Sequence, residues 1–286
     1  MTTGRLSIVG TPIGNLGDLS TRAVATLSEA DAIACEDTRR TGRLLAHFGI
    51  ARTALLVVNE HTEHHRRAEI LERLARGERI ALVSDAGMPL VSDPGGRVVR
   101  AALDAGFAAE VVPGPTALIS ALVLSGIAAD RFVFEGFLPR KGEERRTRLA
   151  GIAVEPRTVV FYESPKRVLR TLHDLIGVCG PDRHVAVARE LTKLHEEVLR
   201  GSLPEVAERL GEEVRGEVVI VLAGAPDPAS LSDQDLRRLL DAERASGASA
   251  RDAVTTVVKR TGEAKRRVYA ISISIDTDID TDIDTD

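Results

Sequence analysis

Short apolar runs alternate with amphipathic stretches from the start of the chain. Five runs rich in Val, Ile, Leu and Ala have the length of β-strands, and the stretches between them carry apolar residues at helical spacing. Strands that alternate with helices predict βαβ units and a largely parallel sheet. We assign them to an N-terminal α/β domain over residues 1–125. The predicted strands are 6–9, 32–35, 55–58, 80–83 and 110–112, and the predicted helices are 22–30, 41–48, 63–75, 97–105 and 116–124.

A second set of strand-like runs follows residue 131, with fewer helices between them. Only residues 189–196 separate the third and fourth runs, so we expect those two strands to pair antiparallel. The pattern predicts a second α/β domain with a mixed sheet over residues 131–224. Its predicted strands are 132–135, 158–162, 184–188, 197–200 and 218–222, and its predicted helices are 166–176 and 203–210.

Residues 225–228 read as a Pro-containing linker, and three helical patterns follow it. Ser232 and Ser249 are candidate N-caps for the first two of them. We predict a small helical appendage over residues 230–270 that is similar to a helix-turn-helix. A docking or dimer-packing element explains three short basic helices equally well.

The last residues, 275–286, repeat the tetrapeptide IDTD three times. The six Asp residues repel one another and leave no apolar face worth burying, so we predict that this segment is disordered. The whole chain has a formal charge of −5, whereas the chain without this tail has a charge of +1. The overall acidity is therefore no argument against a nucleic-acid partner.

Composition excludes several classes of protein. The longest strongly apolar stretch, 117–124, is far shorter than the ~20 residues of a membrane span, and the N-terminus lacks a signal-peptide pattern. Cys35 and Cys179 match neither a disulfide framework nor a zinc site, which favours a cytoplasmic protein. The cluster of His61, His64 and His65 lacks the spacing of metal ligands, so we expect no metal. Only 3% of the residues are aromatic, which disfavours a base-stacking RNA platform.

Three loops at predicted strand ends of the first domain have the composition of a ligand site, and open α/β sheets bind ligands at these ends. The loop 10–18 is rich in Gly but matches neither the P-loop nor the dinucleotide pattern. The loop 84–96 is too long for a simple connection; its Asp85 is a candidate acceptor for a ligand or a turn, whereas Asp93 is better explained as a helix cap. The third loop, 113–117, has two prolines. Together the loops predict a pocket for a small polar molecule.

Charged residues follow strands in both domains. Glu36 and Asp37 follow the second strand, where acids at a helix start are a simpler explanation than catalysis. A basic segment over residues 140–148 is typical of a solvated helix face. Combined with the bases of 166–167 and Lys193, it is alternatively the wall of a phosphate-binding groove.

Seven motifs occur in order along the chain: IVGTPIGNLGDLSTRA, CEDTRRTGRLL, LVSDAGMPLVSDPG, VPGPTA, FEGFLPRK, FYESPKR and ARELTKLHEE. Together they resemble the RsmI family, the bacterial 16S rRNA cytidine 2′-O-methyltransferases. That family belongs to the tetrapyrrole-methylase-like, or class III, S-adenosylmethionine-dependent methyltransferases. The resemblance covers residues 5–224, and the helical appendage is similar to the C-terminal domain of the family.

The resemblance implies two α/β domains with S-adenosylmethionine in the cleft between them, in a homodimer. It implies methylation of the 2′-hydroxyl of a decoding-centre cytidine of 16S rRNA within the 30S subunit. The residues that it assigns to the cofactor are Pro12, Ser84, Asp85, Gly87, Met88, Thr116, Ala117, Tyr162, Leu222 and Ala223.

An aliphatic hydroxyl is a poor nucleophile at neutral pH, so a positioned base assists the transfer. The candidates for this catalytic role are the carboxylates of Glu36, Asp37 and Glu163, of which we prefer the first two, and the amines of Lys166 and Lys193 if their pKa values are depressed. The residues expected to bind RNA are Arg39, Arg140, Lys141, Arg167 and Lys193.

Two other functions remain open: a tetrapyrrole or precorrin methyltransferase of the same fold, and a non-catalytic module that binds RNA or nucleotides. The EDTR and FLPRK segments and the basic C-terminal helices favour RNA over a small macrocycle, because a macrocycle needs none of them.

Overall fold

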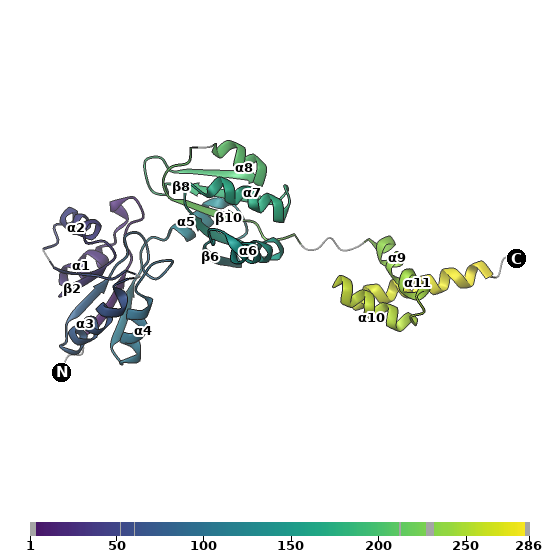
Figure 1. Cartoon of the computed structure of the whole chain (residues 1–286), viewed down its shortest axis with the longest axis horizontal. Helices are drawn as coiled ribbons and strands as arrows, with labels where there is room; N and C mark the ends of the chain where they lie inside the picture. Colours follow the sequence, from purple (N-terminus) through teal and green to yellow (C-terminus); the bar gives the residue numbers. More distant parts are fainter. Residues whose placement is uncertain (1–3, 52, 60, 212, 227–231, 284–286) are drawn as a thin grey trace. The chain divides into compact units, whose positions relative to one another are not determined.

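The computed structural model describes residues 4–283 of the chain apart from 52, 60, 212 and 227–231. The chain divides into two compact units, Met1–Ala225 and Pro226–Asp286. The first unit contains two five-stranded sheets, and the second contains helices (Figure 1). No helix of the described residues is long and apolar enough to cross a membrane.

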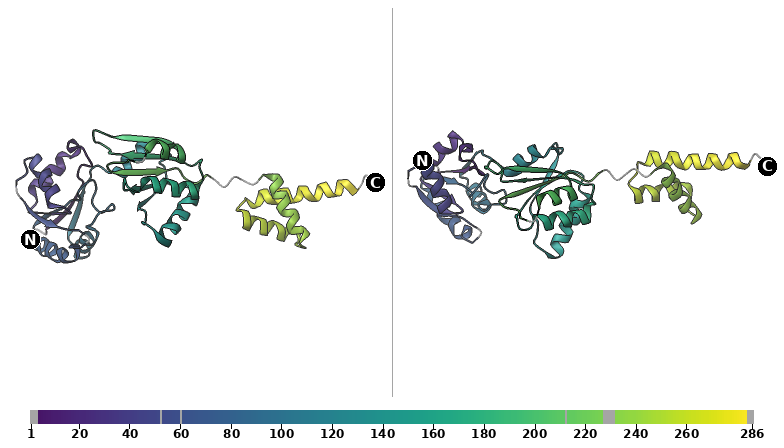
Figure 2. Two further views of the ribbon diagram at one scale, coloured as in Figure 1. Left: turned by 45° about the horizontal axis from the view of Figure 1, so that its top comes forward. Right: turned by 90° about the horizontal axis from the view of Figure 1, so that it is seen from above.

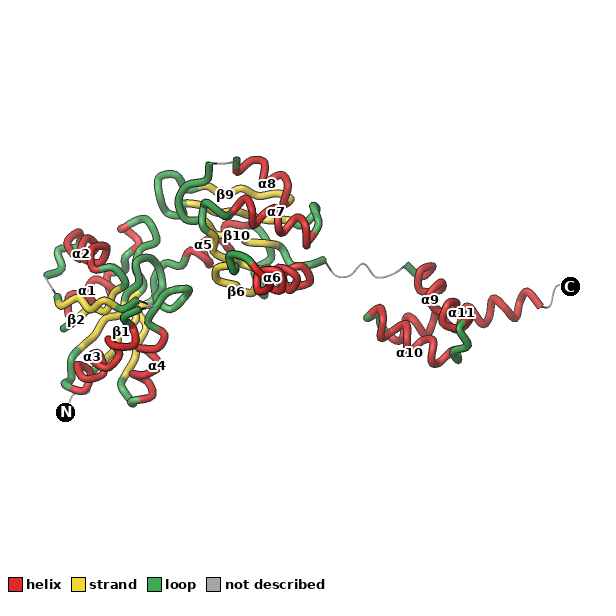
Figure 3. The backbone as a smooth tube through the Cα atoms, in the orientation of Figure 1, coloured by secondary structure: helices red, strands yellow, loops and turns green. Residues whose placement is uncertain are grey.

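The first sheet is parallel throughout, with strand order β3-β2-β4-β1-β5, as the alternating pattern predicts. Successive side chains of a strand point to opposite faces, so each strand buries two sets of residues. One set packs on α1 and α2, the other on α3 and α4, and the sheet lies between two helical layers (Figure 3). The elements are β1 (Arg5–Val9), η1 (Leu16–Asp18), α1 (Thr21–Glu29), β2 (Ala32–Cys35), α2 (Thr38–His47), β3 (Ala54–Val57), α3 (Glu63–Ala75), β4 (Arg79–Leu82), α4 (Gly96–Asp104) and β5 (Ala108–Val112).

The second sheet is mixed, with strand order β6-β7-β10-β8-β9. Strands β8 and β9 pair antiparallel, as predicted, and β10 is antiparallel to both of its neighbours. Three helices, α6, α7 and α8, cover one face. The elements are β6 (Phe132–Phe137), α6 (Gly142–Val154), β7 (Thr158–Glu163), α7 (Val168–Cys179), β8 (His184–Arg189), β9 (Glu197–Ser202), α8 (Leu203–Leu210) and β10 (Val218–Leu222).

Two features of this sheet differ from the prediction. Helix α6 falls in the basic segment, and its buried face contains Arg145 together with Leu149 and Ile152, so a charge interrupts the apolar period. Helix α5 (Ala117–Ser125), assigned by sequence to the end of the first domain, packs on the second sheet. Its Leu118 and Leu122 lie among apolar side chains of β7, β8 and β10, so the structural boundary precedes this helix.

The second unit consists of α9 (Asp233–Ala245), α10 (Ala250–Thr261) and α11 (Lys265–Ile283), which Figure 2 shows from two sides. Leu236, Val257 and Val268 are among the residues of its own small core. Ser232 and Ser249 cap the first two helices, as predicted.

Helix α11 is longer than the sequence pattern predicts. The backbone is helical to Ile283, where the sequence predicts a disordered acidic tail, while residues 284–286 lie outside the described residues. Once preceding turns are packed, each added residue gains a backbone hydrogen bond at little further cost, which carries the helix past its apolar part.

Candidate active site

The three loops singled out in the sequence meet at the carboxyl edge of the first sheet. Thr11 and Gly87 exchange backbone hydrogen bonds of 2.9 and 3.1 Å, which joins the first loop to the second. Gly10 and Gly114 join the first loop to the third: a Cβ on Gly10 would lie 2.7 Å from the Cα of Gly114. Gly10 and Gly114 therefore allow the two loops to pack closely, because no side chain fits between their backbones.

Two loops, one from each sheet, contain left-handed residues that are not glycine. Leu90 and Ser92 have φ angles of 72° and 68°, and Glu190 and Thr192 have φ angles of 50° and 66°. Such conformations cost of the order of 1–3 kcal/mol each and are held only by the surrounding structure. The backbone N–H of Asn15 donates to Thr192 Oγ1 at 3.0 Å, so the second loop rests on the first sheet's glycine-rich loop.

A cavity of about 330 Å³, here called the apolar cavity, lies between the two sheets. Five of the predicted cofactor residues line it: Gly87, Met88, Thr116, Ala117 and Tyr162. The sequence did not identify its other walls, which include Ile13, Val91, Phe137, Ser164, Pro165, Val218 and Val219.

Aromatic contacts hold the Tyr162 ring at this cavity. Its centroid is 5.0 Å from that of Phe134 and 5.6 Å from that of Phe137. Burial raises the pKa of the Tyr162 phenol, so the hydroxyl stays neutral at physiological pH.

Leu222 and Ala223, predicted to contact the cofactor, are not at the cavity. The prediction placed the C-terminal end of β10 at the cleft. Because β10 runs antiparallel to β7, Val218 lies opposite Glu163, whereas Leu222 lies opposite Val159 at the other end of the strand. The beginning of β10 thus forms the wall, and Leu222 is buried in the core under α6–α8.

A second cavity of about 420 Å³ adjoins the first and shares Ile13, Ala86 and Glu217 with it. We call it the basic cavity because three cations, Arg40, Arg43 and Lys193, line it. The predicted cofactor residues Pro12, Ser84 and Asp85 lie here rather than in the apolar cavity.

Lys193 keeps its positive charge in this position. Burial disfavours the charged amine, but hydrogen bonds of 2.9 Å to Glu190 and 3.0 Å to Glu217 outweigh it and raise the pKa of Lys193. A base needs a lowered pKa, so Lys193 is a charge on the cavity wall and not a proton acceptor.

A third cavity of about 640 Å³, here called the acidic cavity, shares Asp85 with the basic cavity and Asp93 with the apolar cavity. Glu36 also lines it. Burial, together with the charges of Glu36 and Asp85, raises the pKa of Asp93 to about 6. Burial and the charge of Asp85 likewise raise the pKa of Glu36. No group of three described His, Cys, Asp or Glu side chains, here or elsewhere, is arranged to hold a metal ion.

Asp93 is a site residue that the sequence reasoning missed. It was expected to cap α4, but the N-cap of that helix is Gly95, whose φ of 112° suits glycine. Asp93 instead lines both the apolar and the acidic cavity. The signal was the turn-forming pair Pro94-Gly95, because the helix then begins two residues later than it would with Asp93 as its cap.

Asp85 is more constrained than a free ligand acceptor. Its Oδ1 accepts from the backbone N–H of Asp37 at 3.1 Å, and its Oδ2 lies 3.4 Å from Nε of Arg40. Burial is the main cause of its raised pKa. The carboxylate thus connects the second-strand loop to the long loop.

Asp37, a predicted base, and Arg39, a predicted RNA contact, pair with each other. Asp37 is the N-cap of α2 and accepts from the backbone N–H of Arg39 at 2.8 Å. The Arg39 guanidinium donates to the same carboxylate at 2.7 Å, and these hydrogen bonds lower the pKa of Asp37 well below its usual range. A carboxylate with so low a pKa is a poor base, and the charge of Arg39 is already compensated.

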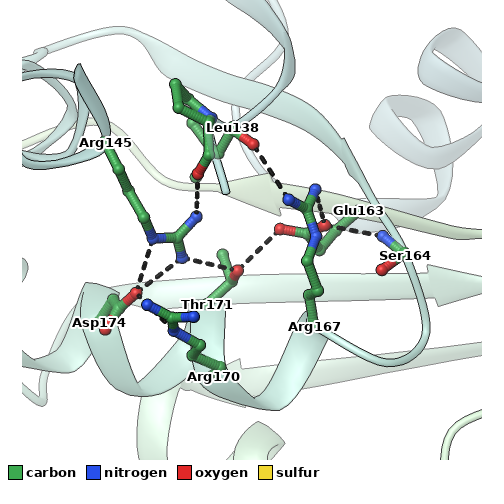
Figure 4. Close-up of polar contacts among 9 residues, drawn as sticks. Leu138, Arg145, Glu163, Ser164, Arg167, Arg170, Thr171 and Asp174 are labelled. Carbon is green, nitrogen blue, oxygen red and sulfur yellow. Dashed lines mark hydrogen bonds and ion pairs between the residues drawn. The ribbon is translucent and has the colours of Figure 1, made fainter. Parts of the chain in front are cut away.

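Glu163 is likewise unsuited to be a base. Its side chain is buried, pairs with Arg167 at 2.5 Å, and accepts from Thr171 Oγ1 and from the backbone N–H of Ser164, both at 2.8 Å (Figure 4). Both oxygens of Glu163 are therefore occupied, and Arg167, predicted to bind RNA, is committed to this pair. Lys166, which lies between Glu163 and Arg167 in the sequence, is exposed.

The sequence pattern of the family "Tetrapyrrole (Corrin/Porphyrin) Methylases" matches residues 5–207. The "Ribosomal RNA small subunit methyltransferase I" of Synechocystis is 45% identical over 96% of this chain and 99% of its own length. The protein of the same name from Xylella fastidiosa is 49% identical over 85% of this chain and 88% of its own length. The chain therefore belongs to the tetrapyrrole methylase family and, within it, to the family of ribosomal RNA small subunit methyltransferase I.

A solved structure shares the fold. It is the uroporphyrin-III C-methyl transferase from Thermus thermophilus complexed with S-adenyl homocysteine, with a TM-score of 0.55 and 22% identity over 77% of this chain and 97% of that one. The predicted fold class is confirmed, and so is the predicted cofactor, S-adenosylmethionine. The apolar cavity suits this cofactor, because its aromatic and aliphatic walls accommodate an adenosine. The hydroxyls of the Ser, Thr and Tyr residues that line the cavity offer hydrogen-bond partners.

Proposed function

We propose that this chain transfers the methyl group of S-adenosylmethionine to the 2′-hydroxyl of a decoding-centre cytidine of 16S rRNA, within the 30S subunit. The names of relatives that cover nearly the whole chain support the rRNA of the small subunit as substrate. The observation that carries the proposal is the junction of three cavities. The apolar cavity borders the acidic cavity, which several carboxylates line, and the basic cavity, which three cations line.

The apolar cavity would hold the cofactor. Tyr162, Met88 and Val219 supply flat and aliphatic contacts, and Thr116 begins helix α5 at the cavity wall. The sulfonium of the bound cofactor supplies an already activated methyl group, so the protein's part is to align acceptor and donor for an in-line displacement. Val91 is held against the cavity by its left-handed neighbours, Leu90 and Ser92.

The proton of the acceptor hydroxyl goes to a carboxylate. Asp93 is the best candidate, because it faces the apolar cavity and a pKa of about 6 leaves it ionised at neutral pH yet basic enough to accept a proton. Glu36 lies on the wall of the same acidic cavity and helps to raise that pKa through its charge.

The RNA backbone would approach through the basic cavity. Arg40, Arg43 and Lys193 attract phosphates there, whereas the acidic cavity repels them. A nucleotide of a loop or an end is splayed out readily enough to reach such a cleft, as in most sequence-specific RNA recognition. The cytoplasm, where small subunits work, is the corresponding location.

The direct test is methyl transfer from radiolabelled S-adenosylmethionine to 30S subunits purified from cells that lack the modification. We expect label in 16S rRNA and, after digestion to nucleosides, in 2′-O-methylcytidine. Label in a methylated base would refute the ribose assignment, and label accepted only by a tetrapyrrole would refute the RNA assignment. Cofactor binding without transfer to any acceptor would support a non-catalytic module instead.

We also propose a homodimer. Helix α5 is apolar on nearly all sides, which is typical of a helix that is buried all round. Its Ile119 and Val123 are nevertheless 43% and 74% exposed, and Val111 nearby in the chain is 55% exposed. A second copy would cover this surface. Light scattering should show a dimer for the native chain and a monomer for Val123→Arg; two monomeric samples would contradict the proposal.

A further inference from the structure

Three cations of the second sheet are exposed without a described ion pair: Arg140, Lys141 and Lys166. Among the residues that the structure describes, none has a carboxylate within ion-pair distance of these three side chains. Other bases of the same segment are neutralised, since Arg146 pairs with Glu143 and Arg148 pairs with Glu135. The exposed positive charge of this region is therefore concentrated in two short loops.

Both loops start at the wall of the apolar cavity. Phe137 lines the cavity, and Arg140 follows three residues later; Pro165 lines the cavity, and Lys166 is the next residue. Because consecutive Cα atoms are 3.8 Å apart, the backbone of each cation, Lys141 included, is within roughly 15 Å of a wall residue. The cations thus lie at the rim of the site where the methyl group would be transferred.

A buried network joins these two loops (Figure 4). From the first loop, the carbonyl of Pro139 accepts from Arg145 Nη1 at 2.9 Å, and the carbonyl of Leu138 accepts from Arg167 Nη1 at 3.4 Å. Arg145 is itself only 4% exposed, so it is a structural cation rather than part of a solvated basic face. Its guanidinium donates to Asp174 Oδ2 at 2.9 Å from Nε and 2.7 Å from Nη2.

Thr171 is the link between the two halves of the network. Its hydroxyl accepts from Arg145 Nη2 at 3.0 Å and donates to Glu163 Oε2 at 2.8 Å. Glu163 in turn pairs with Arg167 at 2.5 Å. Thr171 is fully buried, so no water replaces it without a rearrangement of the surrounding residues.

We propose that this network is a clamp that positions two loops so that Arg140, Lys141 and Lys166 form a single phosphate-binding surface for the rRNA backbone. The proposal rests on the proposed function, because it takes the acceptor to be RNA. Thr171 and Asp174 are then positioning residues: they touch neither cofactor nor RNA but set the spacing of three cations. Charged side chains fixed on a rigid support bind phosphates better than mobile ones, because less ordering is lost on binding.

The first experiment replaces the three cations together. We expect the triple variant R140A/K141A/K166A to raise KM for unmodified 30S subunits about tenfold and to flatten the dependence of log Kd on log salt by about 2, at about 0.7 per lost phosphate contact. The affinity for S-adenosylmethionine, measured by calorimetry without RNA, should stay unchanged. The control is Arg131→Ala, an exposed cation at the other end of β6, which should leave KM within twofold.

The second experiment separates positioning from general support of the fold. Thr171→Val keeps the shape but removes the hydroxyl, and we expect it to raise KM for the subunits about fivefold with kcat unchanged; Thr171→Ser should restore the native KM. In the triple-variant background, Thr171→Val should change KM no further, since it acts through cations that are already gone. Asp174→Asn, at a partly exposed position, is the milder substitute should Thr171→Val fold poorly.

The possible results are distinct. The clamp proposal would be overturned if Thr171→Val raised KM equally in the native and the triple-variant backgrounds. It would also be overturned if Thr171→Val left the KM of the native enzyme unchanged. In both cases the methyltransferase function would stand. A triple variant with native KM and native salt dependence would overturn the phosphate surface. A native enzyme that labels no 30S subunit would instead refute the proposed function itself.

Discussion

The acidic and the basic cavity border the same apolar cavity, share Asp85, and carry opposite charges. In the acidic cavity, burial raises the pKa values of Glu36 and Asp93, and the negative charge of Asp85 raises both further. In the basic cavity, two of the three cations have acidic partners: Arg40 lies beside Asp85, and Lys193 lies beside Glu190 and Glu217. A buried carboxylate with a raised pKa would serve as a proton acceptor, whereas a wall of cations would attract phosphates, so one cleft would separate chemistry from recognition.

The largest effect should come from the acidic side. Asp93→Asn keeps the size of the side chain but removes the base, so we expect kcat to fall at least about 100-fold with unchanged affinity for S-adenosylmethionine. Methyl-transfer assays under saturating cofactor measure it. The matched control is Asp37→Asn in the same cavity, which preserves the helix cap and should retain activity within about twofold. Equal losses in both variants would mean that the two carboxylates do not differ as the structure indicates.

The pH profile should show the same carboxylate. A base is active only when ionised, so kcat/KM should fall about tenfold per pH unit below the pKa of Asp93, near 6. Rates between pH 5 and 8 on 30S subunits measure this. The residual activity of Asp93→Asn should lose this acidic limb; its persistence would assign the pKa to another group.

The basic side should affect binding rather than chemistry. Arg43→Ala should weaken the affinity for 30S subunits about three- to tenfold and flatten the salt dependence, while kcat at saturation is preserved. Filter binding at several salt concentrations measures this. Arg76→Ala, at the C-cap of α3 and so at the opposite edge of the sheet, is the control and should bind normally. A fall in kcat instead would place Arg43 in the chemical step.

Crowded carboxylates should also cost stability. The pKa of Asp93 is raised in the folded chain, so the native state binds its proton more tightly than the unfolded state, and stability falls as pH rises from about 4 to 6. Above this range the ionised carboxylate costs of the order of 1–3 kcal/mol. Asp93→Asn should therefore raise Tm by a few degrees at pH 8 and have little effect at pH 4. A lower Tm at pH 8 would show that the carboxylate stabilises the site.

The smallest effect concerns the acidic tail. Removing residues 276–286 takes away six negative charges, so affinity for 30S subunits should rise about twofold at low salt, with no difference at high salt. Cofactor affinity should stay the same. Loss of activity on deletion would show that the tail contributes to the site.

The periodicity of the sequence predicted all ten strands that the structure describes, because strands depend on local pattern. It also predicted the meeting of three loops, because the ends of parallel strands share one edge of the sheet. It could not show which end of β10 faces the cleft, since apolar strands read alike in both directions; Val218 therefore replaces Leu222 at the wall. Nor could it separate Asp93 from Asp37. Both are acids near a helix start, and the sequence favoured Asp37 as the base and Asp93 as the cap. The structure shows instead that Asp37 caps α2 and that burial raises the pKa of Asp93.

Helix α5 packs on the second sheet, so the two sheets are connected by the chain only through residues 113–116. Two prolines restrict this segment, and it ends at Thr116 on the wall of the apolar cavity. A molecule that fills the apolar cavity would therefore contact both sheets and the segment that joins them, since Gly87 and Met88 follow a strand of the first sheet and Tyr162 and Val219 belong to the second. Occupancy of one small cavity would in this way link the two halves of the first unit.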